Sequence, residues 1–144
     1  MSSDSELQFP DVNYGPKNVE RIKELTISEW SPFFGKDYWE VFIFSMSCAF
    51  AEKLAPAKSV PGTGTMPARV FRQETRHLMR SLAIAATGDI SVIKNPRDYV
   101  KICEQYAYVG FDEIYKKIHQ ENTEDVPVEN VLFNIINQIA RERS

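Results

Sequence analysis

The stretch Asp37-Tyr-Trp-Glu-Val-Phe-Ile-Phe-Ser-Met-Ser-Cys-Ala-Phe-Ala-Glu-Lys-Leu54 decides the fold of this chain. It opens with a capping box, because the side chains of Asp37 and Glu40 can each accept a hydrogen bond from a backbone N–H at a helix start. Apolar residues follow on two helical stripes, Trp39, Phe42, Ile43, Met46, Phe50 and Leu54 on one and Val41, Phe44, Cys48 and Ala51 on the other. A helix that is apolar on two faces is buried on two sides. Residues 37–55 are therefore predicted to form the central helix of an all-α fold.

The rest of the chain fits one compact domain around that helix. A length of 144 residues is typical of a single domain. We assign it to residues 16–144, with residues 1–15 as a flexible N-terminal arm because they are polar and aperiodic. Three prolines and two glycines make residues 55–68 a loop. Five to six helices are expected in total, the others at about 17–26, 72–87, 95–118 (with a kink or a junction at Gly110) and from about 125 onward.

The helix at 72–87 shows its direction of packing through its apolar residues. Leu78, Leu82 and Ala85 are expected to face inward, and Gly88 follows the last turn in the position that glycine favours after a helix.

The composition excludes several classes of protein. The chain is 43% hydrophobic and 26% charged, an ordinary globular mixture. Its first residues lack the pattern of a signal peptide, and no stretch approaches the ~18 apolar residues of a membrane span. We expect a cytoplasmic protein without membrane contact. Cys48 and Cys103 lie within apolar segments and are predicted to be free core residues.

No pattern for catalysis, a metal or a cofactor is apparent. His77 and His119 fall on different predicted helices, outside any recognised metal-binding spacing, and are expected at the surface. The Gly-Thr-Gly-Thr stretch at 62–65 lacks the Lys-Ser/Thr ending of a phosphate-binding loop. The sequence therefore predicts no enzyme activity, no metal and no cofactor.

The distribution of charge is the feature that bears on function. The net charge is −3, yet residues 53–80 carry six basic residues and one acidic residue. The basic residues are Lys53, Lys58, Arg69, Arg72, Arg76 and Arg80. The arginines, spaced 3, 4 and 4 apart, would line one face of a continuous helix with His77 beside them, and three of them stay on that face if the helix begins only at Arg72. Guanidinium groups recognise phosphate or carboxylate through paired hydrogen bonds, so these seven residues form the candidate partner- or phosphate-binding site.

Three interpretations of this arginine stripe stay open. The arginines could be a solvated face that pairs with the acidic remainder of the protein, a docking site for an acidic protein partner, or a contact to nucleic-acid phosphates. A sequence pI near 5.4 argues against a dedicated nucleic-acid binder, whose domain is usually basic.

Three passages of the sequence resemble a known family. They are Phe34–Phe50 with its aromatic residues around Asp37, the Leu-Ala-Ile-Ala-Ala-Thr-Gly-Asp run at 82–89, and residues 102–114 with Glu-Gln-Tyr-Ala-Tyr-Val-Gly-Phe at their centre. The family is that of the small accessory proteins known as DNA phosphorothioation (Dnd) system-associated protein 4. The chain departs from its pattern in the loop at 55–68 and in the N-terminal arm.

The resemblance implies an accessory role without catalytic residues in a prokaryotic DNA-modification or anti-phage defence system. The implied partner is a larger protein subunit of that system, an ATPase or a nuclease, with a homo-oligomer also possible. A DNA-binding accessory factor that uses the arginine stripe on phosphates is the alternative.

Overall fold

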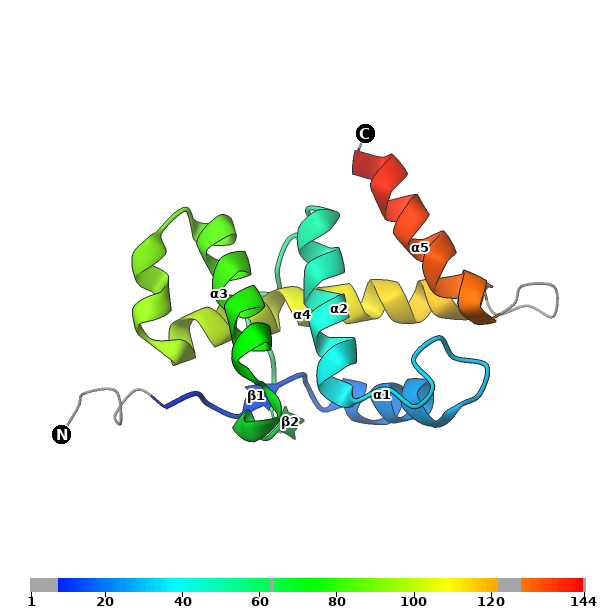
Figure 1. Ribbon diagram of the computed structural model, residues 1–144, viewed down its shortest axis with the longest axis horizontal. Coiled ribbons are helices and arrows are strands. Elements are labelled where there is room, and N and C mark those ends of the chain that lie inside the picture. The colour runs from blue at the N-terminus through cyan, green and yellow to red at the C-terminus, as the bar shows by residue number, and fades with distance from the viewer. Residues whose placement is uncertain (1–7, 63, 122–127, 144) are drawn as a thin grey trace.

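Five α-helices dominate the computed structural model, which describes residues 8–62, 64–121 and 128–143 (Figure 1). The elements in chain order are β1 (Val12–Asn13), α1 (Lys17–Ile27), α2 (Tyr38–Ala51), β2 (Thr65–Met66), the 3-10 helix η2 (Ala68–Val70), α3 (Gln73–Thr87), the 3-10 helix η3 (Ile90–Lys94), α4 (Pro96–Glu121) and α5 (Val128–Arg143). The predicted all-α fold is confirmed, with a single small strand pair added to it.

Helix α2 lies at the centre, as predicted. It crosses the long helix α4, and α3 stands beside it on the same side of α4 (Figure 1). The capping box at its start is formed, with the Asp37 N–H donating to Glu40 Oε2 at 2.8 Å. Between residues 41 and 50 only Ser47 is exposed. The prediction of a helix buried on two sides is therefore confirmed.

The end of α2 comes earlier than residue 55. The helix stops at Ala51, and Lys53 adopts a left-handed conformation with φ 59°. The Leu54 N–H donates to the Ala49 carbonyl at 3.0 Å, which closes the last turn in the manner of a Schellman motif. Lysine in this conformation is strained, and nothing in the sequence around Lys53 predicts a left-handed residue at this position.

Helix α4 is continuous through Gly110, so the alternative of a junction between two helices at this residue is wrong, whereas the close packing expected there is observed. A Cβ atom at position 110 would lie 2.0 Å from the Ser45 carbonyl oxygen of α2. The two helix backbones touch here, which only a residue without a side chain permits.

Helix α3 buries a different face from the one predicted. Thr75, Met79, Leu82 and Ala83 are buried, whereas Leu78 is 56% exposed and Ala85 is also exposed. Leu82 was placed correctly, but the inward assignments of Leu78 and Ala85 are wrong. Met79 takes the core position because the buried face of α3 is rotated by about one residue, or 100°, from the face that was predicted to be buried.

The N-terminal segment from residue 9 to residue 15 belongs to the fold. β1 pairs antiparallel with β2, Val12 opposite Met66, and Val12 is fully buried. The Tyr14 N–H donates to the Gly64 carbonyl at 2.7 Å, and the Ala68 N–H donates to the Asp11 carboxylate at 2.9 Å. The expectation of a flexible arm does not hold for these residues, because the loop at 55–68 supplies their partner strand. The earlier part of the expected arm, residues 1–7, lies outside the described residues.

Both cysteines are free and buried, as predicted. Over the ranges described, no helix has the length and the apolar character needed to cross a lipid bilayer.

Candidate functional site: a cationic groove

The predicted arginine stripe is broken between Arg69 and Arg76. Arg69 lies in η2, and Arg72 precedes the first turn of α3 with extended backbone angles, φ −82° and ψ 175°. The cause is Phe71, whose ring is buried and packs edge-on against Phe42 at a centroid distance of 5.9 Å. Burying this ring turns the chain, so the four arginines do not share one helix face as predicted.

Arg76 is engaged within the protein. Its Nε donates to the Phe71 carbonyl at 2.6 Å, and its Nη2 donates to the Ala68 carbonyl at 3.2 Å. Its guanidinium also lies 4.1 Å from the centre of the Phe9 ring. Arg76 thus holds the turn between η2 and α3 and fastens the N-terminal segment to it.

Arg80 and His77 form a local pair on α3. Arg80 Nη2 lies 2.7 Å from His77 Nδ1, and Nη1 donates to the Tyr99 hydroxyl at 3.3 Å. None of the four arginines makes an ion pair with a carboxylate of the described residues. The interpretation in which they balance the acidic remainder of the protein finds no support there.

Lys53 and Lys58 lie apart from the arginines. Lys53 follows the C-terminal end of α2, about 20 Å along that helix from Tyr38 at its start. The Lys58 carbonyl accepts a hydrogen bond from Gln105 Nε2 at 3.0 Å, which places this lysine against α4. The structure therefore separates the seven predicted residues into several places.

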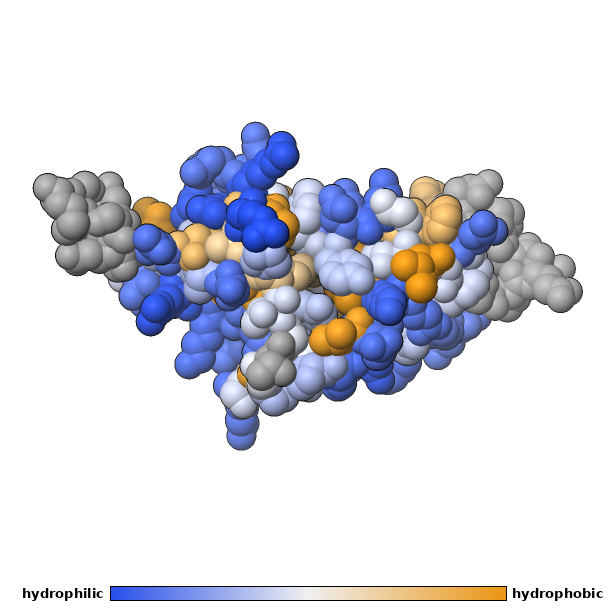
Figure 2. Space-filling view, turned by 90° about the horizontal axis from the view of Figure 1, so that it is seen from below, coloured by the Kyte–Doolittle hydropathy of each residue, from blue (hydrophilic) through white to orange (hydrophobic). Residues whose placement is uncertain are grey.

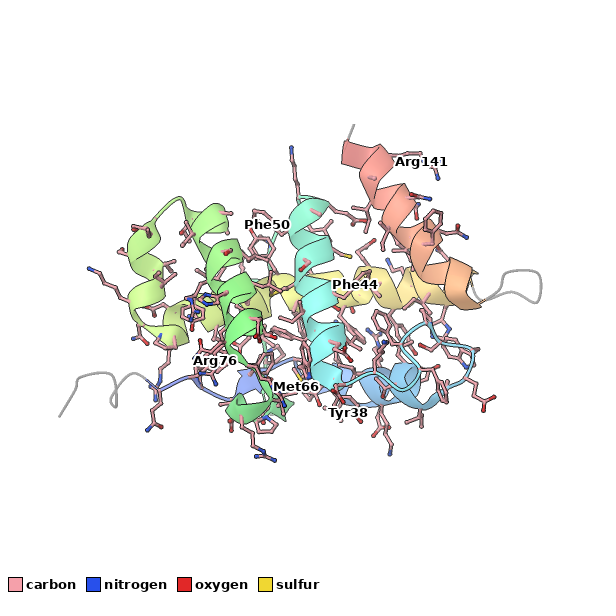
Figure 3. All side chains as sticks on the ribbon, in the orientation of Figure 1. Tyr38, Phe44, Phe50, Met66, Arg76 and Arg141 are labelled. Atoms are coloured by element: carbon pink, nitrogen blue, oxygen red, sulfur yellow. The ribbon has the colours of Figure 1, made fainter. Side chains whose placement is uncertain are left out.

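Arg69 and Arg72 instead border a groove that we call the cationic groove. It has a volume of about 930 Å³ and lies where α2 and α3 begin. Three segments line it: Lys36, Asp37, Tyr38 and Trp39 on one side, Met66, Pro67, Arg69 and Val70 from β2 and η2, and Arg72, Glu74 and Thr75 at the start of α3. Figure 3 shows Tyr38 and Met66 near the starts of α2 and α3, with Arg76 farther along α3.

The cationic groove combines an apolar floor with a charged rim. Met66 is 3% exposed, and Trp39 and Val70 are half-buried. On the rim, the side chains of Lys36, Arg69 and Arg72 are exposed and make no hydrogen bond or ion pair with any other residue that the structure describes. Figure 2 views the molecule from below, and small hydrophobic patches lie between hydrophilic residues on this face.

The two carboxylates of the groove differ in their surroundings. Asp37 accepts a hydrogen bond from the backbone at the start of α2, so its charge serves as the helix cap. Glu74 is exposed in the first turn of α3. The three cations can therefore bind carboxylate or phosphate oxygens of a ligand, while Glu74 disfavours a ligand that is anionic throughout.

Sequence reasoning missed Lys36, Tyr38, Trp39 and Met66 as members of this site. Lys36, Tyr38 and Trp39 lie about 30 residues from Arg69 in sequence, and only the folded chain brings them together with it. Met66 is only three residues from Arg69 but belongs to β2, outside the arginine stripe. One signal was present in the sequence, because Tyr38 is an aromatic residue directly after the capping residue Asp37, in the first turn of a helix.

The remaining reactive groups show no catalytic arrangement. Burial raises the pKa of the Cys48 thiol to about 12, and it also raises the pKa of Cys103, so both thiols are protonated at neutral pH. In the described part of the chain, no group of three His, Cys, Asp or Glu side chains is placed to hold a metal ion.

Fold and groove define a class: a small, mostly helical protein with a cationic groove on its surface. A family model described as DNA sulphur modification system-associated protein 4 matches residues 16–144. The chain belongs to this family, which the sequence resemblance had named. Curated proteins and solved structures gave no significant match.

Proposed function

We propose that this protein is a non-catalytic accessory subunit of a DNA sulphur modification system in the cytoplasm, and that it docks a larger protein of that system, an ATPase or a nuclease. Family membership supports the system. The observation that carries the docking proposal is the cationic groove, where Lys36, Arg69 and Arg72 face solvent without a partner among the described residues. Exposed cations around an apolar floor are typical of a protein–protein interface, which has an apolar centre and a polar rim.

A protein partner fits the groove better than DNA does. Arg76 and Arg80, two of the four arginines expected on phosphates, are engaged with Phe71, Ala68, Tyr99 and His77. Glu74 on the rim would repel a phosphate backbone, and so would the net charge of −3. DNA contact through the three remaining cations is the second candidate.

The experiment is a double charge reversal with a matched control. Arg69→Glu/Arg72→Glu changes the groove, whereas Lys53→Glu/Lys58→Glu makes the same change in charge elsewhere on the surface. Each variant is produced together with the other proteins of the modification system, and co-purification is measured after circular dichroism has shown that the fold is intact. The first variant is expected to lose its partner, because charge reversal adds repulsion to the lost contact. The control is expected to keep it, and loss in both variants or in neither would contradict the proposal.

A salt titration separates the two candidates. Binding to duplex DNA through three cations would weaken with a log–log slope of about −3 as salt rises. We expect partner binding that withstands moderate salt, since the groove has an apolar floor. Salt-sensitive duplex binding that Arg69→Glu/Arg72→Glu abolishes would favour the DNA-contacting role instead.

A further inference from the structure

We propose that the cationic groove takes a short, extended, acidic segment of the partner protein, and that this segment places one aromatic or large aliphatic side chain on the floor formed by Trp39, Met66 and Val70. The inference rests on the proposed docking function and adds the chemistry of the docked segment. Size, charge and the character of the floor each support it.

The size of the groove limits the occupant. Its volume of about 930 Å³ lies within the range of roughly 300–1,000 Å³ found for pockets that enclose small ligands. A few residues of an extended chain fill such a space. The residues that line it come from the first turns of α2 and α3 together with β2 and η2, so the groove does not extend along the length of either helix.

The charges select an acidic segment with a defined pattern. Lys36 lies on the α2 side of the groove, and Arg69 and Arg72 lie on the η2 and α3 side. Carboxylates on both sides of a central residue can reach both groups of cations, and guanidinium groups accept carboxylates in a two-pronged geometry. Glu74 lies on the same rim and repels a ligand that is anionic along its whole length. It therefore favours a segment whose acidic residues are interrupted by uncharged ones.

The apolar floor of the groove favours a docked segment that carries an apolar side chain. Trp39 and Val70 are half-buried and present apolar surface to the groove, Tyr38 beside them is exposed, and Met66, at 3% exposed, lines the groove as part of the core. An aromatic side chain packs well on such a surface, and buried aromatic anchors at the centre of an interface commonly dominate binding. The cations alone would bind any anion, so the anchor residue supplies the selectivity.

The two tryptophans of the chain provide a built-in probe. Trp39 lines the groove, whereas Trp30 packs against His119 with ring centroids 5.1 Å apart. The full chain is labelled with 5-fluorotryptophan, and the two ¹⁹F resonances are assigned with Trp39→Phe. Titrations use the acidic peptide acetyl-GDEDFDEDG-amide, its analogue with serine in place of phenylalanine, a basic analogue acetyl-GKRKFKRKG-amide, inorganic phosphate and a short DNA duplex.

We expect the acidic phenylalanine peptide to shift the Trp39 resonance and to leave the Trp30 resonance unchanged. The serine analogue is expected to bind at least about tenfold more weakly, because it lacks the buried aromatic side chain. The basic analogue should leave Trp39 unshifted, phosphate should shift it less than the acidic phenylalanine peptide does, and Arg69→Glu/Arg72→Glu should abolish the response. Equal affinity for the serine analogue, a stronger response to phosphate or duplex, or no Trp39 shift with the acidic peptide would each overturn the inference.

The outcomes also separate this inference from the docking function. If charge reversal abolishes co-purification of the partner but the acidic peptide leaves Trp39 unchanged, the groove docks a folded surface and only the segment inference fails. If charge reversal leaves the partner bound, the docking function fails whatever the peptide does.

Discussion

The crossing of α2 and α4 can be tested by adding a single methyl group. In Gly110→Ala the new Cβ would lie 2.0 Å from the Ser45 carbonyl oxygen, 2.9 Å from the Ser45 carbonyl carbon and 3.0 Å from the Ala49 Cβ. Two of these atoms belong to backbone, so a side-chain rotation cannot relieve the contact and the helices must separate. Overpacking of a core costs about 1–3 kcal/mol and sometimes more. Alanine regains about 1 kcal/mol through its higher helix propensity.

The expected net effect of Gly110→Ala is a loss of about 2 kcal/mol or more in the free energy of unfolding, with the clash at or above the upper end of that range. Urea unfolding followed by circular dichroism measures it. Ala85→Gly, on the exposed side of α3, is the control for helix propensity alone and should lose about 1 kcal/mol. If Gly110→Ala instead gains about 1 kcal/mol, as propensity alone predicts, the backbone contact between α2 and α4 does not exist.

Four further substitutions test three other features by urea unfolding. Burial raises the pKa of Glu104, so its contribution to stability is present below the ordinary glutamate pKa and is lost as the pH rises through the raised value. In Glu104→Gln the new side chain can still accept the hydrogen bond from the Asn13 N–H. This variant is expected to be more stable than the original chain at pH 7 but no more stable near pH 4. Higher stability near pH 4 and lower stability at pH 7 would contradict the burial argument. Lys53→Gly should gain about 1 kcal/mol by relieving the left-handed conformation, and a loss would show that the lysine side chain outweighs the strain. Arg76→Met should lose about 2 kcal/mol of stability, because two hydrogen bonds to backbone carbonyls are removed. Arg72→Met should change stability by less than about 0.5 kcal/mol. Equal effects of the two substitutions would indicate that the arginines are equivalent, as a uniform stripe requires.

Features that depend on neighbouring residues could be predicted from the sequence. Asp37 and Glu40 cap the helix that they were expected to cap. Asn95 accepts the Arg97 N–H at 3.0 Å at the predicted start of α4, and Gly88 ends α3 in a left-handed conformation with φ 70°. Cys48 and Cys103 are buried because an apolar run surrounds each of them. In each case the interaction closes within a few residues, so the pattern alone contains it.

Features that depend on distant segments could not be predicted. Val12 is buried only because Met66, far along the chain, forms the opposite strand position. The spacing of the arginines predicts one helix face only if the backbone is helical throughout, and burial of Phe71 in the core interrupts it. Lys36 joins Arg69 and Arg72 through the way α2 and α3 begin side by side. The groove therefore arises from the packing of the helices, whereas the excess of positive charge in residues 53–80 is apparent from the sequence.

The pairing of β1 with β2 makes the groove depend on a segment that precedes the family match. The family match begins at residue 16, yet Asp11 and Val12 hold the wall of the groove through Ala68 and Met66. Substitutions of Asp11 or Val12 are therefore expected to shift β2 and η2, and Arg69 with them, even though neither residue lines the groove itself.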